Sequence, residues 1–394
     1  MEFLVIYTEQ HIQLIDSISR FIDTEIAPHC DAWEADEIFP GHKLFKKLGN
    51  AGFLGINKPT EYGGMGLDFS FNVAAAEAFA RIPARGVGMG ITVQTDMATP
   101  ALARHGSEAL KREYLAPAIA GDVVVSLGVS ESGAGSDVAS LKTRALKEGG
   151  DYLIHGSKMW ITNALQADWI CLLANTSDGK PHKNKSLIIV PLRENGRLRN
   201  GIEMNKIRKM GNHSSDTAQI FFDGVRVPQT NRIGEENMGF IYQMEQFQEE
   251  RLAVAARQLA SGRLIDDLAN YLRQRMAFGK PLLDNQYIQF KLAELKTELE
   301  ALRGLVYMAT EIHVAGGDVV ELASMAKLKG GRLTREIADW CVQFYGGMGY
   351  TWENPASRAF RDTRLGSIGG GADEVMLQII AKKMGLMRKP EGHA

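Results

Sequence analysis

A pair of charged residues, Glu250 and Arg251, lies in the stretch QFQEERLAVA, where apolar residues recur three and four positions apart. With Phe247 at i−3 and Val254 at i+4, Glu250 falls on the apolar side of the helix that this period predicts. A charge buried there is costly unless it is paired or used. A carboxylate that faces an apolar wall can serve as a general base, and the alternative is a structural Glu–Arg pair at the surface of a helical bundle.

Two further stretches carry residues that suit a polar, planar ligand. In GVSESGAGSDVAS (128–140), small residues let backbone amides approach a ligand, and the hydroxyls of Ser130 and Ser136 can add hydrogen bonds. In KMWITN, Trp160 and Thr162 would lie on one face of a strand, where an aromatic plane beside a hydroxyl suits a flat heterocycle. The alternatives are an ordinary solvent turn, and a core Trp with a surface Thr.

Three glycine- or arginine-containing stretches follow. Arg275 in RMAFG suits a phosphate, although a solvated helix end is the commoner use of Arg. Glycines interrupt helical patterns in QFYGGMGYTWENPASRAFRD (343–362) and in IGGGADEV (368–375), where open backbone could meet a cofactor. A tight interhelical turn and a simple helix start, with acidic residues matching the dipole, explain these two equally well.

The elements that must position these residues fall into three regions. The hydrophobic period predicts an N-terminal helical domain over 1–120, a central β domain over 121–233 and a C-terminal helical bundle over 234–394. The period runs without a proline from Phe240 to Leu272, which predicts one helix about 50 Å long. The predicted class is therefore α+β, with a β-barrel-like domain between two helical ones.

Composition limits the classes of partner. The chain has 394 residues, 45% of them hydrophobic, and a net charge of −2, which gives no reason to expect nucleic acid. No apolar run is long enough to span a bilayer, and the N-terminus lacks the basic region of a secretory signal. The three widely spaced cysteines form no disulfide or zinc pattern. These features predict a cytoplasmic protein with no bound metal and no membrane insertion.

Taken in order, the motifs resemble the acyl-CoA dehydrogenase family across nearly the whole chain. GVSESGAGSDVAS and QFYGGMGYTWENPASRAFRD match the family's two signatures, and WITN, RMAFG and FDGVRVP fall between them in family order. The resemblance implies the three-domain fold above, with a four-helix bundle at the C-terminus. It also implies non-covalent FAD and a homotetramer built as a dimer of dimers, in which FAD reaches a neighbouring subunit.

Site residues are carried over position by position. The cofactor residues that the resemblance implies are Leu127, Val129, Ser130, Gly135, Ser136, Trp160, Ile161, Thr162, Arg275, Phe278, Gln286, Gln343, Gly346, Gly347, Ala372 and Glu374. Those implied for the substrate are Ser136, Arg251 and Gly370. At the position of Ala372 the family usually has Thr, which puts a side-chain hydrogen bond there in doubt.

The resemblance also implies which residue is the catalytic base, because this chain departs from the family's common pattern at one position. Many members carry the catalytic Glu where this chain has Gly370, whereas the isovaleryl-CoA and long-chain subgroups carry it in a Glu-Arg-Leu triplet on a bundle helix. Glu250-Arg251-Leu252 resembles that triplet. The interval to Arg275 is one residue shorter than is usual, so Glu249 is an alternative, although it follows Glu245 on a more polar helix face.

The implied reaction is α,β-dehydrogenation of an acyl-CoA in fatty acid β-oxidation or branched-chain acyl-CoA metabolism, with electrons passed to an electron-transferring flavoprotein. The acyl group is expected to be branched or of medium to long chain, and IGGGADEV also resembles citronellyl-CoA dehydrogenases. The alternatives are an oxygen-using oxidase or flavin monooxygenase on the same scaffold, and an inert protein that binds FAD or acyl-CoA.

Overall fold

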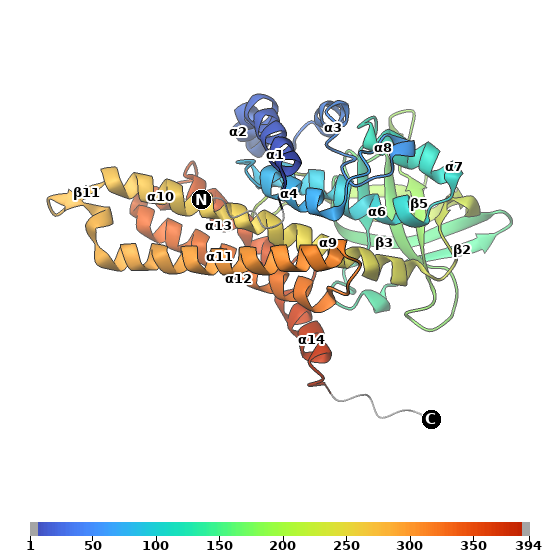
Figure 1. Cartoon of the computed structure of the whole chain (residues 1–394). Coiled ribbons are helices and arrows are strands. Elements are labelled where there is room, and N and C mark those ends of the chain that lie inside the picture. Colours follow the sequence, from blue (N-terminus) through green and yellow to red (C-terminus); the bar gives the residue numbers. More distant parts are fainter. Residues whose placement is uncertain (1–6, 388–394) are drawn as a thin grey trace. The chain divides into compact units, whose positions relative to one another are not determined.

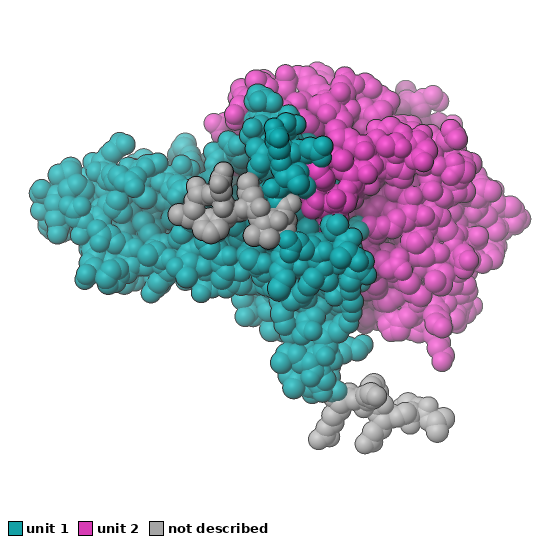
Figure 2. Space-filling model, in the orientation of Figure 1, with its two compact units in different colours: residues 1–20, 72–81, 248–394 teal, residues 21–71, 82–247 magenta. Residues whose placement is uncertain are grey.

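The computed structural model describes residues 7–387, which form two compact units. Unit 1 comprises residues 1–20, 72–81 and 248–394, and unit 2 comprises residues 21–71 and 82–247 (Figure 2). Each unit is built from stretches far apart in the sequence. The boundaries predicted at 120 and 233 follow the hydrophobic period along the chain, and they remain a prediction. The first six residues of the N-terminal segment, predicted not to be a secretory signal, lie outside the described residues.

Unit 2 is organised around one sheet (Figure 1). Its path runs β10-β5-β4-β2-β3-β9-β8, with β1 paired in parallel to β4. The strands are β1 (Val125–Gly128), β2 (Arg144–Glu148), β3 (Asp151–Thr162), β4 (Trp169–Asn175), β5 (Lys185–Pro191), β8 (Ile202–Lys206), β9 (Thr217–Pro228) and β10 (Arg232–Ile233). A short hairpin of β6 (Arg193–Glu194) and β7 (Arg197–Leu198) stands apart from this sheet.

The two central strands β4 and β5 are covered on both faces, which explains their continuous apolar sequences WICLLAN and KSLIIVP. Alternate residues serve two apolar clusters. Trp169, Cys171 and Leu173 of β4 belong to one cluster, whereas Ile170 and Leu172 belong to the other. At β4 and β5 the sheet is therefore a buried layer with an apolar core on each side.

Short helices complete unit 2: α2 (Cys30–Ala35), α3 (Gly41–Asn50), α5 (Arg85–Thr92), α6 (Pro100–His105), α7 (Glu108–Leu110) and α8 (Ala116–Ile119). A buried amide ties α8 to the sheet. Gln94 donates to the carbonyls of Ala118 and Val123 at 3.1 and 2.9 Å, and accepts from the backbone N–H of Val125 in β1 at 2.9 Å. Both ends of the Gln94 amide are therefore used to hold β1, the strand that leads into the Gly-Ser loop.

Unit 1 is helical, as the sequence predicts. Its helices are α1 (Glu9–Phe21), most of α4 (Phe69–Phe79), the second half of α9 (Gly239–Gln258), α10 (Gly262–Gln274), α11 (Gln286–Val314), α12 (Val320–Tyr345), α13 (Pro355–Thr363) and α14 (Asp373–Lys383). Figure 1 shows α10, α11 and α12 as long, roughly aligned rods. The fold as a whole has the predicted order of helical, β and helical regions.

The prediction of one helix from Phe240 to Leu272 is wrong in detail. The α-helical pattern stops at Gln258, a 3₁₀ turn covers Leu259–Ser261, and α10 begins at Gly262. The Ser261 hydroxyl donates to the Gln258 carbonyl at 2.7 Å, which offers the backbone an alternative to the α-helical bond. Periodicity is insensitive to this break because the apolar face continues across it.

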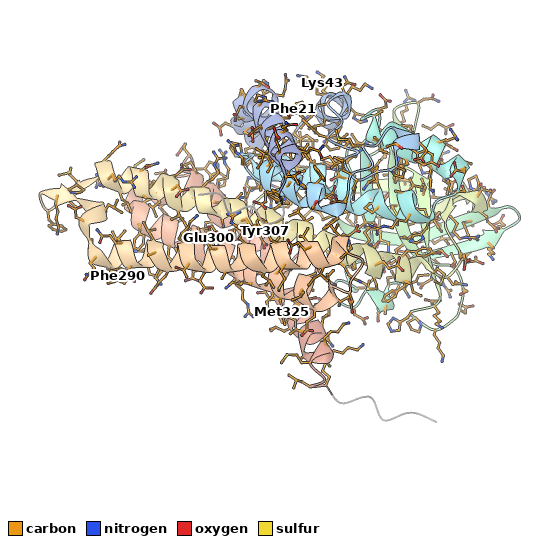
Figure 3. All side chains as sticks on the ribbon, in the orientation of Figure 1. Phe21, Lys43, Phe290, Glu300, Tyr307 and Met325 are labelled. Atoms are coloured by element: carbon orange, nitrogen blue, oxygen red, sulfur yellow. The ribbon has the colours of Figure 1, made fainter. Side chains whose placement is uncertain are left out.

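A buried polar cluster ties the N-terminal segment to α11 within unit 1. The Glu77 carboxylate accepts from the Tyr7 hydroxyl at 2.6 Å and forms an ion pair with Arg303 at 3.2 Å. Arg303 also donates to the hydroxyl of Tyr307, which is labelled in Figure 3. Burial raises the pKa of Glu77, and the neighbouring guanidinium and phenol groups act in the opposite direction. The cluster explains how a charge is tolerated inside the helical unit.

No helix within residues 7–387 is long and apolar enough to cross a membrane. Across the same residues, no group of three or more His, Cys, Asp or Glu side chains is arranged to hold a metal ion.

Candidate active site

The carboxylate of Glu250 lies against the triple-glycine turn within unit 1. Glu250 is only 4% exposed, and a Cβ built on Gly370 would lie 3.2 Å from its Oε1 atom. Gly370 has φ +63°, a left-handed conformation that glycine adopts without steric cost. Glu250 is the predicted catalytic carboxylate, and Gly370 is the position at which many family members carry theirs. The structure brings these two positions together.

The alternative base, Glu249, has a different partner. Its Oε1 atom lies 3.1 Å from Nε2 of His313 on α11. The adjacent position, Glu250, faces the glycine turn instead, so the two carboxylates diverge around the helix as their spacing requires. This arrangement is consistent with Glu250 as the group that meets a substrate, because Glu250 is the carboxylate that lies at the glycine turn.

Arg251 follows Glu250 on α9 and is also buried. Burial lowers the pKa of Arg251, while the charge of Glu250 acts in the opposite direction. A guanidinium stays protonated in proteins, so Arg251 supplies a positive charge inside unit 1. The pair is not the solvated surface pair that the sequence analysis offers as an alternative.

In unit 2 a buried lysine holds the Gly-Ser loop against β3. Lys158 is fully buried, and its ammonium group donates to Glu131 Oε1 at 2.9 Å and to the Val129 carbonyl at 3.0 Å. The Glu131 carboxylate also accepts from the backbone N–H groups of Lys142 and Thr143 at 2.7 and 3.0 Å. Burial lowers the pKa of Lys158 to about 8, and Glu131 acts in the opposite direction. This network fixes the backbone that the resemblance assigns to the cofactor.

Trp160 stands out of the sheet at an irregularity in β3. The pairing of β3 with β9 shifts between Lys158 and Ile161, and Trp160 has φ +61°, which is rare and strained for a bulky residue. The indole is 52% exposed, so the alternative of a core Trp is excluded. A Cβ on Gly135 would lie 4.0 Å from the indole, which places the glycine loop beside the ring.

The shared face of Trp160 and Thr162 remains a prediction, and burial along this part of β3 alternates in the way that it requires. Ile161 is buried, Thr162 is half-buried and Trp160 is exposed. The structure still offers an aromatic plane, a nearby loop of small residues and a partly accessible hydroxyl. These features fit a flat, polar-edged heterocycle such as a flavin, and backbone strain at an exposed aromatic is characteristic of ligand sites.

The remaining cofactor residues lie in unit 1 at two separate places. Arg275 and Phe278 belong to a hairpin of β11 (Met276–Ala277) and β12 (Lys280–Pro281), beside the start of α11 and the end of α12. Phe278 is fully exposed at the tip with φ +50°. The cofactor residues at this end of the helices are Arg275, Phe278, Gln286, Gln343, Gly346 and Gly347.

Ala372 and Glu374 lie at the other place, next to the glycine turn. Ala372 occupies the N-cap position of α14, and its side chain makes no capping hydrogen bond. The Thr that the family usually has at this position could make one. Along α12, Lys327 of this end and Gln343 of the hairpin end are 16 residues apart, or about 24 Å. Within one chain, the cofactor residues at the hairpin end and those beside the glycine turn are therefore far apart.

Comparison with known proteins identifies the family. Models of the acyl-CoA dehydrogenase N-terminal, middle and C-terminal domains match residues 8–122, 126–225 and 237–385. The chain is 35% identical to the long-chain specific acyl-CoA dehydrogenase of Sus scrofa over 385 residues, covering 96% of this chain and 87% of that protein. The chain belongs to the acyl-CoA dehydrogenase family.

Other members of the family are similar over their full length. The isovaleryl-CoA dehydrogenase of Oryza sativa is 34% identical, with 96% of this chain and 92% of that protein covered. An acyl-CoA dehydrogenase structure from Geobacillus kaustophilus matches with a TM-score of 0.90 at 35% identity, covering 96% and 99% of the two chains. A Mycobacterium smegmatis glutaryl-CoA dehydrogenase in complex with FADH2 matches with a TM-score of 0.90 at 28% identity, covering 99% and 98%.

A further structural match concerns electron transfer. A chain from a structure described as the electron transferring flavoprotein of Acidaminococcus fermentans has a TM-score of 0.91 at 32% identity, with 99% of this chain and all of that chain covered.

The family match confirms several predictions. The predicted family, its fold, an oxidoreductase that acts on acyl-CoA, and FAD as the cofactor are all properties of acyl-CoA dehydrogenases. The individual site residues remain predictions. Sequence reasoning missed Glu131, although it lies inside the first signature, and Lys158, which stands two residues before Trp160. The signal that could have revealed Lys158 is its place in DYLIHGSKMWIT, where the alternation that buries Tyr152 and Ile154 also turns Lys158 inward.

Trp160→Ala should weaken FAD binding while leaving the fold of this acyl-CoA dehydrogenase intact. The change removes a large planar contact but keeps a Cβ at the same left-handed backbone position. Because the Trp160 side chain is 52% exposed, thermal stability of the apoprotein should change little. We expect the dissociation constant of FAD to rise about tenfold or more. Fluorescence titration of apoprotein with FAD measures this, with Leu146→Ala, another exposed apolar residue of the sheet, as the control. Unchanged FAD affinity in Trp160→Ala would remove this residue from the cofactor site.

Proposed function

We propose that this protein catalyses the FAD-dependent α,β-dehydrogenation of an acyl-CoA thioester to the trans-2-enoyl-CoA, with Glu250 as the base. The observation that carries the proposal is the Glu250 carboxylate at the Gly370 turn, 3.2 Å from where a side chain of residue 370 would begin. A carboxylate at that place replaces the one that the common family pattern puts at position 370.

In this proposal Glu250 breaks the α C–H bond and takes the proton on its carboxylate, while the electron pair of that bond forms the new C=C bond. The apolar surroundings of the α9 face strengthen the carboxylate as a base because they destabilise its ionised form. FAD, when bound, accepts the hydride that leaves the β carbon. The chain's other contribution is to hold both reactants still, through the Trp160 ring, the hydroxyl of Thr162 and the loop fixed by Lys158.

The acyl group in this proposal is branched or of medium to long chain. The similarity to a long-chain specific and to an isovaleryl-CoA dehydrogenase supports these two classes. A physical reason is that Gly370 adds no side chain beside the reacting carbons, so the base approaches from α9 and leaves the turn side open. Arg251 and Ser136 are the proposed polar contacts of the substrate.

The proposed partners are an electron-transferring flavoprotein and three further copies of this chain. The proposed location is the cytoplasm. The similarity to the Acidaminococcus fermentans chain supports the first. Support for the second comes from the 16-residue separation along α12 between Lys327, beside the Gly370 turn, and Gln343 at the hairpin end. A cofactor at the Gly370 end is too distant for Arg275 and Phe278 of the same chain, so these residues would serve a neighbouring subunit.

Mixing the yellow protein anaerobically with isovaleryl-, octanoyl- and palmitoyl-CoA tests the proposed function. We expect at least one of them to bleach the flavin within seconds and to yield the 2-enoyl-CoA by mass spectrometry. The reduced flavin should survive for minutes in air and be reoxidised rapidly by an electron-transferring flavoprotein. Rapid reoxidation by oxygen would favour an oxidase, and flavin that no acyl-CoA bleaches would overturn the proposal.

A further inference from the structure

Lys327 is a fully buried lysine in the first third of α12, two residues after the Met325 labelled in Figure 3. Its ammonium group donates to the backbone carbonyl of Gly371. Neither the family motifs nor the predicted site includes this residue. Burying an ammonium group costs free energy unless a partner group compensates for it. We therefore looked for groups near Lys327 that interact more strongly with a positive charge than with a neutral side chain.

The carbonyl that Lys327 binds belongs to the same turn that Glu250 touches. Gly370 and Gly371 have φ +63° and +94°, left-handed conformations that favour glycine. Glu250 Oε1 lies against Gly370, and the Lys327 ammonium lies against Gly371. The base and the lysine therefore contact adjacent residues of one short loop.

The charged groups around Lys327 come from two elements, α14 and α9. Asp373 and Glu374 of α14 and Glu250 of α9 favour its protonated form, whereas Arg251 opposes it. Burial is the largest effect and lowers the pKa of Lys327 to about 8, so the group is still mostly charged at pH 7.

Asp373 shares its charge with other partners. Its Oδ2 atom lies 3.3 Å from Nε of Arg332 and 3.9 Å from Nη1 of Arg335. Two guanidinium groups therefore partly neutralise Asp373. As a result, the negative charge of Asp373 offsets less of the positive potential that Lys327 produces at Glu250.

We propose that Lys327 is a positioning residue of the active site, which fixes the Gly369–Gly371 turn and keeps the Glu250 carboxylate in the ionised form that removes a proton. The inference rests on the proposed function, because it takes Glu250 as the base. Electrostatic interaction is mutual, so a carboxylate that favours the ammonium is itself stabilised by it. The expected consequence is a base that is ready at a lower pH than its burial alone would permit.

Lys327→Met tests the charge, since it keeps the length of the side chain and removes the ammonium. We expect the acid limb of the pH profile of flavin reduction at limiting substrate to move upward by about one pH unit. Below both limbs the rate should then be about tenfold lower than in the wild type. FAD absorbance and melting temperature are recorded for each variant. Lys329→Met, on the same helix with an ion pair to Glu298, is the matched control and should leave the profile unchanged.

A second readout isolates proton removal. 3,3-Dimethylbutanoyl-CoA has no hydrogen on its β carbon, so it can exchange its α protons for deuterium without any hydride transfer. Its exchange in D2O, followed by NMR, should show the same shift of the acid limb in Lys327→Met and should be lost in Glu250→Gln. Lys327→Arg keeps the charge and should retain the wild-type acid limb even where the altered shape lowers the rate.

An opposite shift is expected from Asp373→Asn. This variant removes a negative charge that competes for Lys327, so the acid limb should move to lower pH, and it tests the inference even where Lys327→Met melts early. Wild-type limbs in both variants, or equal losses in Lys327→Met and Lys327→Arg without any shift, would overturn the role of Lys327 while leaving the proposed function intact. Full activity of Glu250→Gln would instead overturn the assignment of Glu250 as the base, on which this inference rests.

Discussion

Glu250→Gln should lower the rate of flavin reduction by acyl-CoA by about 10²- to 10⁴-fold, the usual cost of losing a general base. The amide keeps the size of the side chain and its contact with the Gly370 turn, but it cannot take the α proton. FAD content should not change, because Glu250 is not among the predicted cofactor residues. Stopped-flow bleaching of the 450 nm flavin band, at about pH 7.5, measures the rate directly.

Glu249→Gln is the matched control on the same helix. Its carboxylate is paired with His313, so the variant should lose that contact and retain most of the rate. The opposite result, with full-speed reduction in Glu250→Gln and loss in Glu249→Gln, would assign the base to position 249. Full speed in both variants would leave the helix without a catalytic carboxylate.

Moving the base to position 370 should succeed only after Glu250 has been shortened. A side chain at Gly370 must adopt φ +63°, which costs about 1–2 kcal/mol, and its Cβ would meet Glu250 Oε1 at 3.2 Å. Gly370→Glu alone therefore crowds two carboxylates and should lower both the rate and the melting temperature. In Glu250→Ala the space is open, and adding Gly370→Glu should raise the rate about tenfold or more above Glu250→Ala alone.

The recovered activity should favour straight chains over branched ones, since the new side chain fills space beside the reacting carbons. Rates with octanoyl-CoA and isovaleryl-CoA give this comparison. Gly370→Gln in the Glu250→Ala background is the control for shape without basicity. Equal rates for the Glu and Gln versions would show that position 370 cannot deliver a carboxylate to the substrate.

The helical period and the motifs were sufficient to predict the fold order and to single out Glu250. Both signals are local: an apolar face that repeats along one helix, and glycines that only certain turns require. The preference for Glu250 over Glu249 follows from the same period, and the pairing of Glu249 with His313 is consistent with it.

Other features depend on residues far apart in the sequence and leave no periodic signal. Lys327 lies in AKLKGG, which reads as an ordinary solvated lysine, and its burial depends on a turn 44 residues later. The strained backbone at Trp160 lies where the pairing of β3 with β9 shifts, and the break at Leu259–Ser261 carries a hydrogen bond from a single hydroxyl group. Long-range pairing and single hydrogen bonds decide such details, and neither alters the local pattern from which they would have to be inferred.

Under the proposed function, the hairpin tip at Phe278 would couple the binding of FAD to the association of subunits. An isolated chain must keep a fully wetted aromatic ring in a strained backbone conformation, and covering such a ring is worth about 1.5–3 kcal/mol. If the covering surface is completed by FAD on a neighbouring subunit, each binding event strengthens the other by the same factor. Under that condition, removal of FAD promotes dissociation of the subunits, and dilution of the protein promotes loss of FAD. The fraction of enzyme that holds FAD then depends on the total protein concentration.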